Sequence, residues 1–146
     1  MLHRKLIPIE LRMKLNSSYL NYPRHLVREL MHKYSQHGDY SQFGEQKFIL
    51  EYFGSSSGQY LDIGAGLPIT GSNTFALFKN GWKGICVDPL SRNYWLHRRL
   101  RSSDIFVQSL VGHPGMKPFY VFEPYEYSTT SESVAEKVIS NFGNEI

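Results

Sequence analysis

The sequence predicts an α/β fold with a parallel sheet preceded by N-terminal helices. Three short apolar runs, at 59–64, 83–88 and 104–111, have the length and composition of buried strands. Segments of helical periodicity separate them, which gives the order β-α-β-α-β. That order implies right-handed crossovers and parallel strands that are buried on both faces. The expected arrangement is a Rossmann-like sheet.

Composition indicates one core of modest size. The chain has 146 residues, of which 41% are hydrophobic and 20% charged, and it contains no apolar run long enough to cross a bilayer. Charges interrupt the basic stretch MLHRKLIPIELRMKL, which therefore lacks the hydrophobic segment of a secretory signal. We expect a cytoplasmic protein with no membrane partner. The single cysteine, Cys86, excludes an internal disulfide and a cysteine-based zinc cluster.

Charge is distributed unevenly along the chain. Residues 1–50 carry eight Lys or Arg against four acids, whereas residues 123–146 carry one Lys against five acids. A basic N-terminal segment could follow nucleic-acid phosphates, but these basic residues alternate with Leu and Ile as in an ordinary amphipathic helix. We therefore expect a solvated face and no nucleic-acid partner. An interaction or nucleic-acid-binding module that uses the basic N-terminal helices is kept as an alternative.

Helical periodicity occupies the first third of the chain. Apolar residues recur at helical spacing in 24–34 and again in 44–53. The stretch GSSSGQ at 54–59 is rich in turn residues, and the pattern changes after it. The sequence therefore predicts an N-terminal helical segment at residues 1–56 and a partial Rossmann-like domain at residues 57–146.

Two helices are expected between the strands. The stretch 72–81 begins with capping residues and stops at Asn80 and Gly81. The next helix follows the second strand, and we expect its arginines to face mostly outward: Arg92, Arg98, Arg99 and Arg101. The run PFYVFE at 118–123 follows turn residues without a helix, so it is predicted to pair antiparallel with the third strand. A last helical pattern covers 134–142.

Two acids lie where two of these strands end. In an open parallel sheet, ligands bind beyond the carboxyl ends of the strands, at turns that expose backbone amides. Gly64 and Gly66 have no side chain that would keep a ligand away. Asp62 offers a carboxylate to a cationic amine, and Asp88 lies where such folds accept hydrogen bonds from ribose hydroxyls. Together they predict a nucleoside-shaped site.

The turn does not suit a dinucleotide. The third glycine of the dinucleotide motif is replaced by Ile69, Pro68 delays the helix, and Asp62 would face phosphates unfavourably. S-adenosylmethionine fits better, because it carries no phosphate and its amino group is cationic. The alternative is a glycine turn that merely links a strand to a helix.

Two segments resemble the FkbM family of S-adenosylmethionine-dependent methyltransferases. They are YSQFGEQKFILEYF at 40–53 and YLDIGAGLPITGSNTFALFKNGWKGICVDPLSRNYWLHR at 60–98, within a match that runs from about Tyr40 to about Phe122. Nothing after Phe122 matches the family's fourth strand. The resemblance therefore implies a truncated first half of a class I methyltransferase fold. It implies O-methylation of a sugar or small-metabolite hydroxyl, with a truncated, catalytically inactive S-adenosylmethionine-binding fragment as the alternative.

The same resemblance implies a set of cofactor contacts. Positions 62, 64 and 66 would approach the methionine end, and Asp88 would hold the ribose, although family members usually have the longer Glu there. Further positions would border the adenine or the mouth of the site. The predicted cofactor-binding residues are Gln42, Glu45, Asp62, Gly64, Ala65, Gly66, Asp88, Pro89, Leu90, Ser109 and Leu110.

No catalytic residue is assigned from the sequence. His113 and Glu45 are candidates for a general base, but a loop histidine is usually solvated, and a glutamate in a first helical turn usually serves the helix dipole. The histidines show no metal-ligand spacing, so no metal is expected.

The fold that the resemblance implies would leave one edge of the first strand without a partner strand. An unpaired apolar edge favours association. We expect partial cover of this edge by the N-terminal helices, together with a tendency to form a homodimer.

Overall fold

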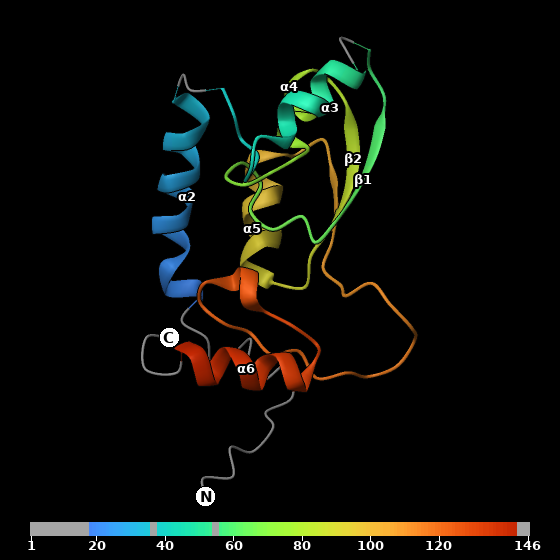
Figure 1. The fold of residues 1–146 in the computed structure, drawn as a ribbon. Helices are drawn as coiled ribbons and strands as arrows, with labels where there is room; N and C mark the ends of the chain where they lie inside the picture. The colour runs from blue at the N-terminus through green and yellow to red at the C-terminus, as the bar shows by residue number, and fades with distance from the viewer. Residues whose placement is uncertain (1–17, 36–37, 54–55, 143–146) are drawn as a thin grey trace, which may run out of the picture. The chain divides into compact units, whose positions relative to one another are not determined.

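The computed structural model describes residues 18–35, 38–53 and 56–142. It confirms an α/β fold in which helices alternate with the strands of a three-stranded, all-parallel sheet, preceded by helices (Figure 1). The described residues fall into two compact units, 18–112 and 113–142. The basic stretch at 1–15 lies outside the described residues.

The sheet belongs to the first unit and has the strand order β1-β2-β3. β1 (Gln59–Ile63) and β2 (Lys83–Val87) lie where the sequence predicts them, and β3 is shorter than expected, at Ile105–Val107. β1 and β2 pair with Asp62 opposite Cys86. Within the described part of the chain, no strand pairs with the outer edge of β1.

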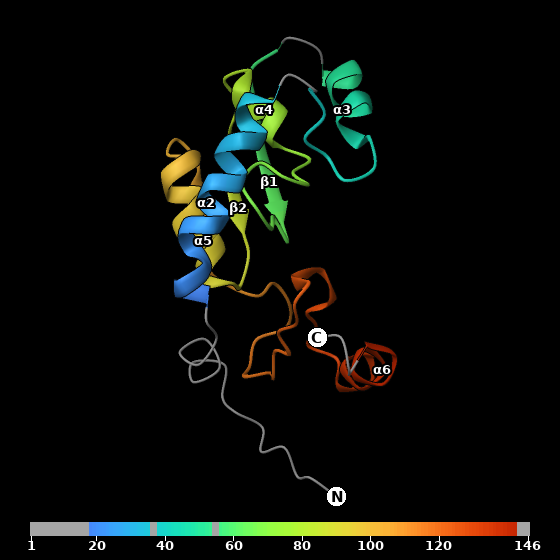
Figure 2. The same ribbon diagram turned by 90° about the vertical axis from the view of Figure 1, so that its left-hand side faces the viewer.

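Two layers of helix lie beside the sheet. α4 (Phe75–Lys79) contacts β2, and α5 (Ser91–Leu100) contacts β3. α2 (Ser18–Tyr34) packs on α5, and α3 (Glu45–Phe53) packs on α4. Figures 1 and 2 show α2 and α5 on the same side of the sheet. The described helices include none with the length and apolar character needed to cross a bilayer.

Among the described residues, helices cover only one face of the sheet, so the expectation of strands buried on both faces is wrong. Side chains at alternating positions of the strands face away from the helices and are 41–62% exposed: Leu61, Ile63, Ile85, Ile105 and Val107. The reason is topological. Two right-handed crossovers between strands that succeed one another in one direction place both helices on the same face. Covering the other face requires a crossover in the opposite direction.

The apolar core of this unit combines α4, the end of α5 and the segment that precedes α3. Tyr40 packs edge-on against Phe75, with ring centroids 4.7 Å apart. The Nζ of Lys79 donates to the Tyr40 hydroxyl at 2.9 Å. Gln46, also buried, accepts a hydrogen bond from the Tyr40 backbone amide at 3.0 Å. Tyr40 therefore anchors the start of α3 to the helical layer.

The arginines of α5 do not all face outward as predicted. Arg98 and Arg99 are exposed, but Arg92 and Arg101 are buried. Arg101 lies just beyond the last helical turn, where helical spacing no longer determines which way a side chain faces. Its position is explained by polar partners from several segments, which are described below.

The second unit contains a short 3₁₀ helix, η1 (Tyr125–Tyr127), and α6 (Glu132–Phe142), which confirms the helical pattern at 134–142. The predicted strand at 118–123 is wrong, because Tyr120 forms only an isolated antiparallel bridge, to Thr129. Pro118 begins this run and Pro124 follows it, and neither has the backbone N–H that a ladder requires.

The contact between β1 and β2 leaves no room for a side chain at residue 84. A Cβ at Gly84 would lie 1.9 Å from a ring carbon of Tyr60. The ring cannot swing away easily, because its hydroxyl donates to Asp104 at 2.6 Å. We expect Gly84→Ala to lower the free energy of unfolding by about 3 kcal/mol in urea titrations. Gly112→Ala, where a Cβ meets open space, is expected to change it by less than about 0.5 kcal/mol. Equal stability of the two variants would contradict this packing.

Candidate functional site

The chain leaves β1 through a glycine turn. Gly64 has φ +77° and Gly66 has φ +58°, a region of backbone conformation that favours glycine. The amides of Gly64 and Ala65 both donate to the Val87 carbonyl, at 2.8 and 3.1 Å. These bonds tie the turn to the end of β2. A Cβ at Gly64 would have no atom within 4 Å, so the open surface of the turn lies at this residue.

Asp88 lies beneath the turn and is 6% exposed. Its Oδ1 accepts hydrogen bonds from the Leu90 amide and from Asn93 Nδ2, both at 2.9 Å. Its Oδ2 accepts from the Gly66 amide at 3.1 Å. Burial raises the pKa of the Asp88 carboxyl, and these hydrogen bonds act in the opposite direction. The carboxylate therefore joins the glycine turn to the start of α5.

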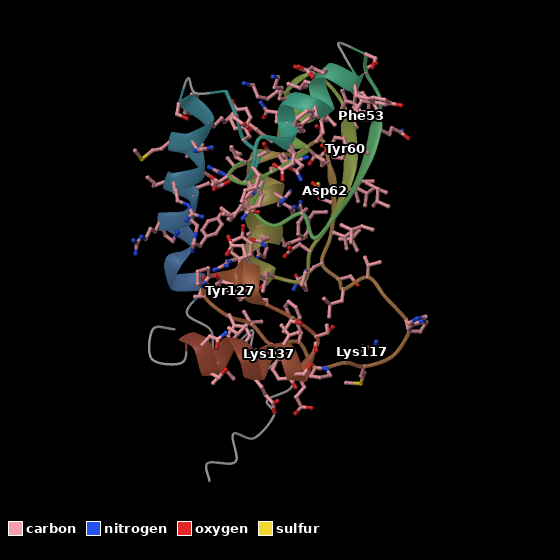
Figure 3. The ribbon with its side chains drawn as sticks, in the orientation of Figure 1. Phe53, Tyr60, Asp62, Lys117, Tyr127 and Lys137 are labelled. Atoms are coloured by element: carbon pink, nitrogen blue, oxygen red, sulfur yellow. The ribbon has the colours of Figure 1, made fainter. Side chains whose placement is uncertain are left out.

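Asp62 shares the helix-covered face of the sheet with Asp88. Asp62 is opposite Cys86, and Asp88 is two residues farther along the same strand direction, so all three side chains lie on one face. Figure 3 marks Asp62 beside β1, on the side where α5 lies. Its Oδ2 accepts a hydrogen bond from the Thr74 hydroxyl at 2.6 Å. Among the described residues, no donor reaches its Oδ1. Asp62 therefore retains acceptor capacity that Asp88 has largely used.

A carboxylate that the sequence reasoning missed enters the same loop from α2. Glu29 is fully buried, and its Oε2 accepts from the amides of Ile69 and Thr70 at 2.9 and 3.0 Å. These two amides of the β1–α4 loop are therefore satisfied by the protein itself. A signal was present in the sequence, because Glu29 lies between Leu26 and Leu30 on the apolar side of the helix.

His97 supports the turn from below. It is fully buried, and its Nε2 lies 3.1 Å from the Gly66 carbonyl. Burial, aided by the positive charge of Arg101, lowers the pKa of His97 to about 3. The imidazole is therefore neutral at physiological pH, and its Nε2 donates to the carbonyl.

Cys86 is placed on the same face but has no nucleophilic character. Its side chain is buried, and desolvation raises the pKa of the thiol to about 12. A thiol that stays protonated is a poor nucleophile. Cys86 behaves as a small buried residue of the core.

The residues predicted to border the adenine lie on two segments that meet. Gln108 Nε2 donates to the Pro89 carbonyl at 3.3 Å, which joins the end of β2 to the chain after β3. Leu90 is buried at the start of α5. Ser109 and Leu110 are exposed, and the Ser109 hydroxyl donates to the Leu110 carbonyl at 3.0 Å. Of this group, Leu90 is the residue least accessible to a ligand.

Gln42 and Glu45 lie at the start of α3. Gln42 is exposed, whereas the Glu45 carboxylate accepts from the Phe43 amide at 2.7 Å. Hydrogen bonds from its own amide and from that of Phe43 lower the pKa of Glu45, which makes it a weaker base. In the described residues, no hydrogen bond joins either side chain to the glycine turn. His113 is exposed and belongs to the other unit.

No group of three or more His, Cys, Asp or Glu suited to a metal ion occurs within 18–35, 38–53 and 56–142. Comparisons with models of protein families, with curated proteins and with solved structures find no match. A function for the chain is therefore inferred from its motifs and from the geometry of the turn.

The burial of His97 predicts a pH dependence of stability. Its pKa is about 3 in the folded protein, against an ordinary value of 6.5. Between these values the unfolded chain binds a proton that the native state does not, so stability falls as the pH drops below about 6.5, by up to about 1.4 kcal/mol per pH unit. His97→Gln keeps an N–H for the Gly66 carbonyl but cannot titrate. We expect it to flatten the curve of unfolding free energy against pH in this window.

Urea unfolding at a series of pH values measures this effect. His113→Gln, a change at an exposed histidine, serves as the control and is expected to leave the slope as in the wild type. A slope in His97→Gln equal to that of the wild type would rule out His97 as its source.

Proposed function

We propose that this chain binds S-adenosylmethionine and is a methyltransferase that acts on the hydroxyl of a sugar or another small metabolite. The observation that carries the proposal is the Asp62 carboxylate, which keeps one oxygen available beside an open glycine turn. A cationic amine is the natural partner of that oxygen. The FkbM-like motifs support the same choice. In this proposal the sheet is the Rossmann-like first half of a class I methyltransferase fold.

The two ends of the cofactor fit the described residues unequally. At the methionine end, Asp62 Oδ1 can accept the amine without displacing any protein donor. At the ribose end, Asp88 can accept fewer additional hydrogen bonds. Each carboxylate oxygen accepts about two hydrogen bonds. Two donors already reach Asp88 Oδ1 and one reaches Oδ2, so a single ribose hydroxyl can be accepted while these bonds persist.

The chain's own residues would bind and orient the ligand. When bound, S-adenosylmethionine supplies an electrophilic methyl group. Asp62 would hold the amine, and the bare backbone at Gly64 would allow close approach. A hydroxyl acceptor also benefits from a general base. We assign no residue to that role, because Glu45 is a weakened base and His97 is enclosed beneath the turn.

A second candidate is a protein that binds S-adenosylmethionine without turnover. One observation favours it: within the described residues, no helix covers the exposed apolar face of the sheet, so one wall of a closed site is missing. Exclusion of water from the reacting centre requires such walls. Binding without methyl transfer to any hydroxyl acceptor would select this candidate.

Isothermal calorimetry with S-adenosylmethionine tests the binding proposal. We expect Asp62→Asn to weaken binding by at least about tenfold, because the variant cannot form a charge-assisted hydrogen bond to the amine. S-adenosylhomocysteine keeps the amine and is expected to show the same loss. Glu51→Gln removes an exposed carboxylate of α3 and serves as the control.

Binding that is undetectable in the wild type, or equal in Asp62→Asn, would contradict the proposal. Equal affinity in Asp88→Asn would remove only the ribose role of Asp88.

We also propose that the chain forms a homodimer through β1. The outer edge of β1 carries backbone groups with no partner strand among the described residues. Two such edges can pair antiparallel about a two-fold axis, which joins the two apolar faces into one continuous surface. Leu61 and Ile63 lie on that face at the proposed junction.

Sedimentation at several protein concentrations measures the association. The wild type is expected to show a concentration-dependent dimer, and Leu61→Lys combined with Ile63→Lys is expected to shift it to monomer, because like charges would meet at the junction. Glu51→Lys, on α3, is the charge-matched control. A wild-type monomer at every concentration would refute the dimer.

A further inference from the structure

A buried polar network lies beneath the glycine turn and ends at Asp62. Arg101, just beyond α5, is 1% exposed. A guanidinium group carries five N–H donors. Five acceptors lie within hydrogen-bond distance of them: Asp104 Oδ2, the Pro68 carbonyl, Ser72 Oγ, Tyr60 Oη and Thr74 Oγ1. Because every donor has an acceptor, the guanidinium is held in one position.

The network is anchored to the sheet at its other end. Asp104 Oδ2 accepts from Arg101 Nε at 2.8 Å, and Asp104 Oδ1 accepts from the Gly84 amide at 2.9 Å. Gly84 belongs to β2. The guanidinium is therefore fixed in position relative to the backbone of β2, the central strand.

Thr74 connects the Arg101 guanidinium to Asp62 by two hydrogen bonds. Arg101 Nη2 donates to Thr74 Oγ1 at 3.0 Å. A hydroxyl has a single proton. Since the guanidinium can only donate, the Thr74 proton is directed to Asp62 Oδ2, which lies 2.6 Å away. That bond sets the rotation of the carboxylate, and hence the direction of Oδ1.

We infer that Thr74 is a positioning residue. Together with Arg101 it sets the direction of the Asp62 oxygen that faces the cationic amine of an adenosyl amino-acid ligand. The inference rests on the proposed function and adds a residue to the same site. Thr74 does not touch the ligand in this arrangement and acts through Asp62. Its effect is therefore confined to ligands that carry the amine.

Two ligands separate positioning from a purely structural role. S-adenosylmethionine is a sulfonium whose amino-acid chain carries the amine, whereas 5′-methylthioadenosine is a neutral adenosyl thioether that lacks this chain and its amine. By calorimetry, we expect Thr74→Val to weaken S-adenosylmethionine binding by about tenfold and to leave methylthioadenosine binding within about twofold of the wild type. Thr74→Ser keeps the hydroxyl and is expected to bind both ligands as the wild type does.

Two controls sharpen the comparison. Thr70→Val makes the same change in the same loop, at a buried hydroxyl that has no hydrogen-bond partner within the described part of the chain, and is expected to leave both affinities unchanged. In an Asp62→Asn background, Thr74→Val is expected to cause no further loss, because residues that act as one unit are not additive.

The outcomes are distinct. If Thr74→Val binds S-adenosylmethionine as the wild type does, or loses affinity for both ligands equally, the positioning role is overturned while the proposed function stands. If the wild type binds neither ligand, the proposed function and this inference fail together. Thr74→Ala is measured with the same pair of ligands, so that a folding defect in the valine variant does not decide the result.

Discussion

The buried Arg101–Asp104 pair is the interaction on which the first unit depends most. Its two charges lie 2.8 Å apart and are almost completely removed from water. Breaking a buried pair typically costs about 3–5 kcal/mol, because the remaining charge keeps its desolvation penalty. Here the penalty is offset by a complete set of hydrogen bonds to the guanidinium. These bonds join both crossovers to β2, so the pair acts as a polar core beside the small apolar one.

The glycine turn is shaped by carboxylates that approach it from different elements. Asp88, just after β2, accepts a hydrogen bond from the Gly66 amide. Glu29 of α2 accepts hydrogen bonds from the amides of Ile69 and Thr70. Each carboxylate satisfies backbone donors that would otherwise be buried without partners. The turn is therefore rigid along most of its length and open near Gly64. The sequence suggests that the backbone amides of this loop are available to a ligand, but most of them already donate to acceptors within the protein.

Sequence patterns predicted β1 and β2 well, and the last strand and the environment of the side chains less well. A short apolar run before Gly64 identifies β1, and one before Asp88 and Pro89 identifies β2, because a strand and its turn are local. The cover of the sheet is not local: Leu61 is as apolar as a residue buried on both sides, yet no described helix packs on it. The burial of Arg101 could not be predicted from the sequence, since its polar partners come from three separate segments: β1, the β1–α4 loop and the chain before β3. Glu29 could have been found from its place on an apolar stripe.

Asp62 and Asp88 look equivalent in sequence but differ in what their oxygens can still accept. Both follow the same rule of position, at the end of a parallel strand and on one face. Asp88 is used to join the turn to α5, so its charge contributes to the fold before any ligand arrives. Among the residues that the structure describes, Asp62 has one donor, the Thr74 hydroxyl, whose direction is set by Arg101. The cation binding that we propose for the turn therefore depends on how many donors each acid already holds, and not on the number of acids at the sheet edge.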